Sequence, residues 1–183
     1  MKQILISFLR VLLLLAIAGV VAVFFLYPYV AEPSREQWSQ SHSLSDALAN
    51  ARSVTFVEFT PRFLDAGAGR ILRREVVFQR LDATKDQIDR LRSATSSFVV
   101  FSPFRCIAGC FEPHHRVDVV CQDGTAFQFE VCFHYRNFRF DKHSAEPLPA
   151  SWLPRLRQFF TELGMPPRTD EEYQKLVEEK TKA

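Results

Sequence analysis

Cysteine and histidine side chains gather in one short part of the chain. All four cysteines lie between positions 106 and 132, and three of the five histidines lie within this range or just beyond it. Thiols and imidazoles form disulfides, bind zinc and act as nucleophile and base. This cluster is therefore the part of the sequence that points to chemistry. Its members are Cys106, Cys110, His114, His115, Cys121, Cys132 and His134.

A predicted β-hairpin around Asp123 decides which members of the cluster share a face. A three-residue loop over 122–124, with Gly124 in the left-handed region, pairs Cys121 with Thr125. This register gathers apolar side chains on one face and sets opposite charges across from each other on the second face, whereas a two-residue turn would mix the two. The pairs that it predicts are Val119 with Phe127, Val117 with Phe129, His115 with Val131, Arg116 with Glu130 and Asp118 with Gln128.

The same register separates the cysteines, because successive residues of a strand point to opposite faces. Cys121 is predicted on the apolar face. Cys132 is predicted on the second face, across from His114, and His134 follows on that face two residues later. A disulfide between Cys121 and Cys132 is therefore disfavoured.

Three interpretations of the cluster stay open. An oxidising compartment favours a structural disulfide, which would join Cys110 to Cys132 or Cys106 to Cys110. Buried thiols that act as small hydrophobic side chains are the alternative that needs no function, and Cys121 is the best example. The third interpretation is a zinc site, although its spacing is not that of a standard zinc finger. Its ligands would be Cys106, Cys110, His114, Cys132 and, as a further candidate, His134.

Catalysis by a thiol would need His114 to activate Cys132 as a base. No third residue that would orient such a pair can be named from the sequence. The sequence also contains no nucleophile elbow, phosphate-binding loop or HExxH motif. We therefore predict no catalytic residue, and the sequence favours a protein that is not an enzyme.

The residues around the cluster resemble a motif of small bacterial proteins to which no function is assigned. The motif consists of Cys-Phe-Glu-Pro-His-His-Arg at 110–116 and Val-Cys-Phe at 131–133, with a looser similarity over 152–163. Such proteins often carry a further cysteine three places after the one that matches Cys132. The chain has Tyr135 there, which weakens a metal or redox interpretation. The resemblance implies no activity.

A long apolar segment near the N-terminus is typical of a membrane anchor. Residues 11–27 are apolar, and the flanking residues extend the segment to the ~20 residues that cross a bilayer. Lys2 and Arg10 precede it, whereas the charges after it nearly cancel, so the N-terminus is expected in the cytoplasm. Cleavage of a signal peptide after 16–18 would leave a strongly apolar new terminus, so an uncleaved anchor is predicted. We expect a single-pass cell-membrane protein, held by residues 4–30, with its C-terminal domain outside the cytoplasm.

The predicted organisation is an anchor over 1–31, a polar juxtamembrane linker over 32–44 and one extracytoplasmic domain over 45–183. Along this domain, alternation of apolar and polar residues predicts strands, and capping signals predict helices. The strands are expected over 53–60, 71–81 and 98–101 and in the hairpin, and the helices over 45–52, after Thr84, over 152–163 and after Thr169. This order indicates an α+β fold, an antiparallel sheet packed by helices.

Composition narrows the class of function. A net charge of +2 is too small a bias to indicate nucleic acid, and a strand with one solvated face explains the aromatic and basic residues over 134–140. The 18 phenylalanines are expected to fill the core. The sequence thus favours a membrane-anchored binding or structural module with no cofactor, whose partner is another envelope protein. The alternative is a zinc or thiol-redox site in the cysteine and histidine cluster.

Overall fold

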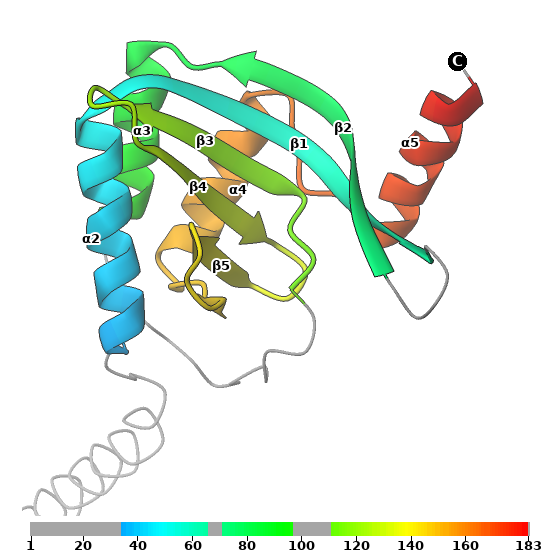
Figure 1. Ribbon diagram of the computed structural model, residues 1–183, viewed down its shortest axis with the longest axis horizontal. Helices are drawn as coiled ribbons and strands as arrows, with labels where there is room; N and C mark the ends of the chain where they lie inside the picture. Colours follow the sequence, from blue (N-terminus) through cyan, green and yellow to red (C-terminus); the bar gives the residue numbers. More distant parts are fainter. Residues whose placement is uncertain (1–33, 66–70, 97–110, 183) are drawn as a thin grey trace, which may run out of the picture.

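The computed structural model describes residues 34–65, 71–96 and 111–182, and in these ranges the chain forms an α+β domain (Figure 1). One antiparallel sheet of the described residues has the strand order β2-β1-β3-β4-β5-β6. The predicted fold class is therefore confirmed. The elements are α2 (Arg35–Ala49), β1 (Ala51–Asp65), β2 (Ile71–Asp82), α3 (Lys85–Thr95), β3 (His115–Cys121), β4 (Ala126–Cys132), β5 (Asn137–Phe140), β6 (Glu146–Pro147), α4 (Trp152–Glu162) and α5 (Asp170–Lys182).

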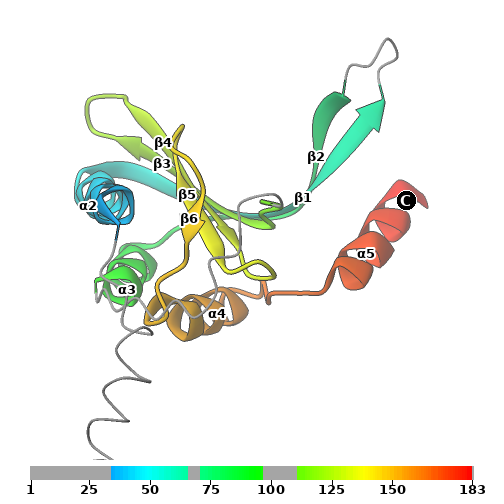
Figure 2. The same ribbon diagram turned by 90° about the horizontal axis from the view of Figure 1, so that it is seen from below.

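The helices divide into two groups. Helices α2, α3 and α4 lie together on one side of the sheet, whereas α5 lies apart from them (Figure 2). Helix α5 is beside the β1–β2 arm, by which we mean residues 59–65 and 71–78, where these two strands extend beyond the rest of the sheet. This arrangement leaves α5 with few neighbours, so the contacts that hold it are decisive for any site next to it.

Aromatic side chains fill the space between the sheet and the first three helices. Phe56, Phe129, Phe138 and Trp152 have no exposed surface. The ring of Trp152 in α4 lies 5.3 Å from that of Phe138 and 6.3 Å from that of Phe129. Burial of such large apolar side chains is the main favourable contribution to folding. The phenylalanines among them fill the core, as the sequence predicted.

The hairpin has the predicted register. Strand β3 pairs with β4 through all five predicted pairs, from His115 with Val131 to Val119 with Phe127. The backbone N–H of Cys121 donates to the carbonyl oxygen of Thr125 (2.8 Å), and Gly124 has φ of 86°. The left-handed glycine therefore closes a three-residue loop that keeps the apolar face continuous.

The helix starts predicted after Thr84 and after Thr169 are also confirmed. Thr84 and Gln87 cap α3 reciprocally. The N–H of Thr169 donates to Glu172 Oε2 (2.7 Å) and the N–H of Glu172 donates to the hydroxyl of Thr169 (3.3 Å), so the same device starts α5. Gly164, with φ of 77°, follows the C-cap of α4. Each signal satisfies helix-end groups that have no partner inside the helix.

The predicted start of the first helix of the domain is wrong. Helix α2 begins at Arg35, capped by Ser34, rather than at Ser45, and residues 35–44 are helical instead of a linker. The helix is amphipathic in an unexpected way, because the amides of Gln37 and Gln40 are buried. They donate to the backbone oxygens of Pro147 and Ser144, both at 2.9 Å. Polar residues thus form the buried side of the first turns of α2.

The predicted end of the first strand is wrong as well. Strand β1 does not stop before Pro61 but continues to Asp65, with Pro61 paired to Glu75 of β2. Strand β3 accompanies β1 only as far as Glu58. Pro61 therefore lies where β1 has a single neighbour, and a missing N–H is tolerated at such an edge. The continuation of β1 forms the arm beside α5.

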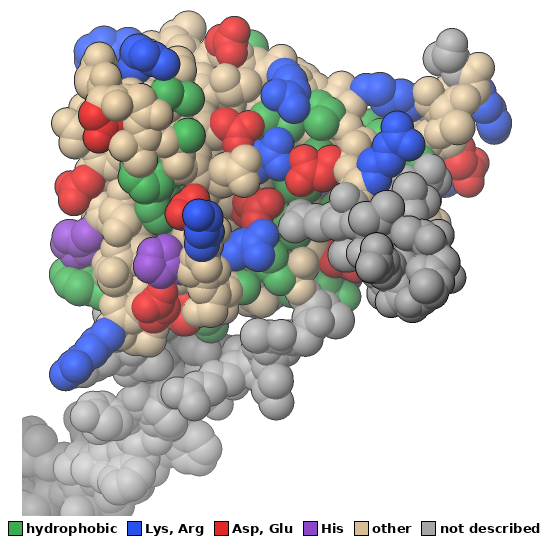
Figure 3. Space-filling view, in the orientation of Figure 1, with side chains coloured by type: hydrophobic (Ala, Val, Ile, Leu, Met, Phe, Trp, Pro, Cys, Tyr) green, Lys and Arg blue, Asp and Glu red, His purple; other side chains and the backbone are tan. Residues whose placement is uncertain are grey.

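The second face of the sheet carries paired charges. Arg116 donates to Glu75 (2.8 Å) and lies 2.9 Å from Asp118, while its guanidinium packs over the ring of Phe59. Burial opposes the charge of Arg116, but these carboxylates prevail and raise its pKa. Acidic and basic side chains lie next to each other on this face in Figure 3. The charges on this face compensate one another, so acidic and basic side chains are mixed there (Figure 3).

The predicted membrane anchor, residues 1–31, lies outside the described residues, as do Cys106, Cys110 and the strand predicted over 98–101. In the described ranges, no helix combines the length and the apolar character needed to cross a bilayer. The anchor therefore stays a prediction.

Replacing Gly124 by alanine should destabilise the domain by about 1–2 kcal/mol, because a Cβ is unfavourable at positive φ. No atom lies within 4 Å of the position such a Cβ would take, so the backbone alone is tested. Gly124→Asn, which tolerates this conformation, should cost less. Thermal or urea unfolding would measure both variants, and equal stability of Gly124→Ala and the unmodified chain would contradict the assigned turn.

Candidate functional site

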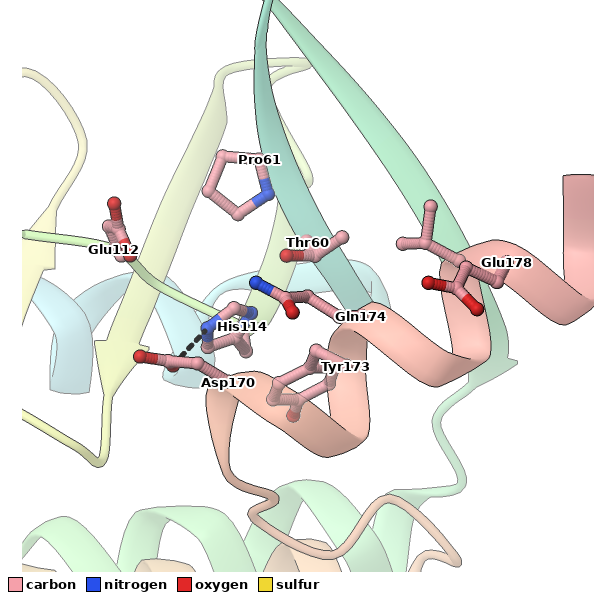
Figure 4. A pocket seen from close by; sticks show the side chains of 9 residues that line it. Thr60, Pro61, Glu112, His114, Asp170, Tyr173, Gln174 and Glu178 are labelled. Atoms are coloured by element: carbon pink, nitrogen blue, oxygen red, sulfur yellow. Dashed lines mark ion pairs between the residues drawn. The ribbon is translucent and has the colours of Figure 1, made fainter.

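A pocket of about 540 Å³ lies between α5, the start of the β1–β2 arm and the segment that leads into β3 (Figure 4). Its volume is within the range of ordinary ligand sites. Figure 4 shows His114 and Gln174 pointing into it, with Glu112 and Glu178 at opposite ends. The described residues that line it are Thr60, Pro61, Glu112, His114, Asp170, Tyr173, Gln174, Val177 and Glu178.

Tyr173 builds one wall of the pocket. Its ring stacks on the imidazole of His114 with the centroids 3.9 Å apart, and Phe78 of β2 stacks beside it at 5.8 Å. Tyr173 is almost fully buried as a result. The three rings join the start of β3, helix α5 and the arm, so the pocket depends on this stack.

Charged contacts add to the stack at both ends of α5. Just before the helix, Arg168 forms an ion pair with Glu58 of β1, whose side chain is 2% exposed. Near the other end, Lys180 donates to the backbone oxygen of Val77. Loss of one partner of a buried pair leaves an uncompensated charge, which is costly. These contacts therefore hold α5 in a single position along the arm.

The imidazole of His114 has a defined orientation. Its Nδ1 lies 3.2 Å from the carbonyl oxygen of Phe59, and its Nε2 lies 3.7 Å from Oδ1 of Asp170. Burial lowers the pKa of His114, and the Phe59 carbonyl, Asp170 and Glu112 only partly oppose this effect. The ring is therefore neutral at neutral pH. Since a carbonyl can only accept, the proton is on Nδ1, and the lone pair of Nε2 faces the carboxylate of Asp170.

The pocket is acidic. Glu112, Asp170 and Glu178 are among the described residues that line it, and none of these lining residues is a lysine or arginine. With His114 neutral, the charged side chains that line the pocket are carboxylates. Two hydrogen-bond acceptors, His114 Nε2 and Asp170 Oδ1, converge at its centre. The arrangement suits a group that is both positively charged and a hydrogen-bond donor.

Cys132 lies next to this region but is not arranged as a nucleophile. Its side chain is fully buried, and the N–H of Tyr135 points at its sulfur at 3.5 Å. Burial raises the pKa of this thiol. The ring nitrogens of His114 face oxygens of Phe59 and Asp170 rather than the Cys132 thiol. A buried thiol without a base is unreactive.

The remaining cluster residues are dispersed. Cys121 lies on the apolar face, as predicted, with its sulfur 3.7 Å from the backbone oxygen of Ala47. Cys121 and Cys132 are not joined to each other by a disulfide. The side chain of His134 is exposed and packs against Tyr135. No group of three metal-ligating side chains occurs in the described ranges, and because Cys106 and Cys110 lie outside them, the disulfide and the zinc site stay predictions.

Sequence reasoning identified His114 but missed its neighbours. Asp170, Tyr173 and Glu112 were not candidates, because nothing local marks them as functional. Asp170 and Tyr173 are brought to His114 only by the long arm and by the turn that redirects the chain after α4. The one local signal was the capping box of Thr169, which fixes where α5 begins and therefore which way Asp170 points.

His115, the next residue, has a structural role. It points into the core between Phe160 and Phe133, and its Nε2–H donates to the backbone oxygen of Met165 at 2.9 Å. Burial lowers its pKa to about 3, against the opposing effect of the hydrogen bond to Met165. This neutral histidine fastens the turn after α4 to the sheet.

Comparison with known proteins gives no homologue from which a function could be inferred. The sequence matches no protein-family model, and neither a curated protein nor a solved structure is significantly similar to it. The function is therefore inferred from the pocket itself.

The stability of the domain should fall as the pH drops from 6.5 towards 3. Unfolded His115 takes up a proton near pH 6.5 but folded His115 does so only near 3, so the unfolded state binds more protons in this window. The contribution reaches about 1.4 kcal/mol for each pH unit. In His115→Gln, which keeps a donor for Met165, this contribution should vanish. Unfolding measured at several pH values would show it, and an unchanged slope in the variant would refute it.

Proposed function

We propose that this chain is a membrane-anchored binding domain of the cell envelope, and that the pocket beside α5 binds a cationic segment of another envelope protein. It performs no catalysis. Residues 1–31 serve as the anchor in this proposal, with the domain outside the cytoplasm. The observation that carries the binding function is the convergence of two acceptors, His114 Nε2 and Asp170 Oδ1, in an acidic pocket.

A bound ammonium or guanidinium group supplies the hydrogen-bond donor that both of these acceptor atoms can share. The two acceptor atoms are 3.7 Å apart, so one donor nitrogen placed to one side of the pair can lie about 2.9 Å from each, an ordinary hydrogen-bond distance. Unlike protonation of the imidazole, this solution keeps the buried ring of His114 neutral. Hydrogen bonds between charged partners are also stronger than those between neutral ones.

The extent of the pocket favours a peptide segment over an isolated small cation. Glu112 and Glu178 lie at opposite ends with His114 and Gln174 between them, so acidic groups are distributed along its length (Figure 4). Lysine or arginine side chains spaced along a segment match this distribution. Charge complementarity of this kind gives specificity and a fast association rate.

The test uses the full chain in lipid nanodiscs and two synthetic peptides, one with alternating lysine and alanine and one with glutamine in place of lysine. The lysine peptide should bind, the glutamine peptide should not, and added salt should weaken binding. Asp170→Asn should weaken it about tenfold or more, because a charged hydrogen bond is lost. Binding should also weaken at acidic pH, below the ordinary titration range of histidine, because burial lowers the pKa of His114 and a proton competes for its Nε2 only there. Fluorescence anisotropy of a labelled peptide would measure all of these.

A matched pair of variants on α5 provides the control. Glu178 lines the pocket, whereas Glu179, the next residue of the same helix, is exposed and does not. Glu178→Gln should weaken binding about two- to fivefold, as for other exposed ion pairs, and Glu179→Gln should not. Equal effects of the two variants, or equal binding of both peptides, would overturn the proposal.

A further inference from the structure

Helix α2 carries an unusual exposed side chain. Trp38 is 51% exposed, and no other large hydrophobic side chain of the described residues is exposed. The other tryptophan of the chain, Trp152, is completely buried. The indole of Trp38 packs against the ring of His42 on the same helix, at 4.5 Å, yet half of its surface remains open.

The first turns of α2 present Trp38 rigidly. The capping box between Ser34 and Gln37 fixes where the helix begins. The amides of Gln37 and Gln40 fasten the opposite side of the helix to the segment from Ser144 to Pro147. With that side held against the domain, the Trp38 side cannot rotate inward. The exposure of the indole thus follows from the packing of α2.

The position of Trp38 in the chain points to what covers it. The apolar segment predicted to cross the membrane ends at residue 31, only three residues before Ser34. Three residues span at most about 10 Å, and one helical turn adds about 5 Å. The headgroup layer extends about 5–8 Å beyond the hydrocarbon core. A membrane-anchored chain therefore cannot carry Trp38 far from the lipid headgroups.

We propose that Trp38 inserts into the headgroup layer of the bilayer and docks the N-terminal end of α2 on the membrane surface. Tryptophan prefers this layer because its ring is apolar and its N–H needs a polar partner. Exposed Arg35 and Lys142 lie nearby, but Glu36 and Glu146 offset them, so the indole rather than charge drives the contact. This inference rests on the anchor of the proposed function.

Docking through α2 has a consequence for the pocket. Helices α2 and α5 lie at opposite ends of the domain in both ribbon views (Figures 1 and 2). A domain held at the membrane by the α2 end presents the pocket beside α5 at the end away from that contact. The pocket would then bind the cationic segment of its partner at a distance from the bilayer surface.

Quenching of tryptophan fluorescence tests this directly. The full chain is reconstituted in phosphatidylcholine vesicles whose acyl chains carry bromine, either close to the headgroup or near the chain end. Because the chain has two tryptophans and Trp152 is buried, only Trp38 is accessible to bromine. We expect quenching of about half of the emission, stronger with bromine close to the headgroup. Trp38→Phe should abolish it while leaving the near-ultraviolet circular dichroism of the domain unchanged except for one indole.

The outcomes separate this inference from the proposed function. A chain that resists alkaline extraction from the vesicles but shows equal emission with and without bromine would overturn the docking of Trp38 and leave the anchor intact. A chain that alkaline carbonate extracts would overturn the anchor, and the docking with it. Binding of the lysine peptide, which does not involve α2, is measured independently of both.

Discussion

The position of α5 depends on one contact, the stacking of Tyr173 between His114 and Phe78. Helix α5 lies apart from the other helices, and among the described residues the buried Val177 and the contacts of Arg168 and Lys180 add to this stack. The stack has two effects. It sets Asp170 and Glu178 across from the sheet, which creates the acidic pocket, and it buries His114, which keeps that imidazole neutral. The proposed binding chemistry follows from both.

Two adjacent histidines, one just before β3 and one at its first position, have different roles. His114 lines the pocket, whereas His115 points into the core and fastens the turn at Met165. Burial lowers the pKa of both, so both rings are neutral at neutral pH. The difference lies in their neighbours, because only His114 faces a carboxylate, that of Asp170. His115 holds the turn that leads to α5, and it thereby helps to place Asp170 beside His114.

Local interactions were predictable from the sequence and distant ones were not. The hairpin register follows from Gly124 and from alternation over a few residues, and the structure has it as predicted. The start of α2 was missed because Gln37 and Gln40 are buried only by bonding to backbone more than a hundred residues away. For the same reason, His114 was predicted as a site residue and Asp170 was not. His114 belongs to the cysteine and histidine cluster of the sequence, but nothing near Asp170 in sequence shows that the fold brings the two together.

The location of peptide binding tests the central claim most directly. Amide hydrogen exchange of the full chain, followed by mass spectrometry with and without the lysine peptide, reports which segments are covered. The account predicts slower exchange in Asp170–Lys182 and in residues 111–114 on binding, and no change in α3 (Lys85–Thr95), which lies in the other helix group. Unchanged exchange in Asp170–Lys182 with peptide bound, or equal protection of α3, would contradict it.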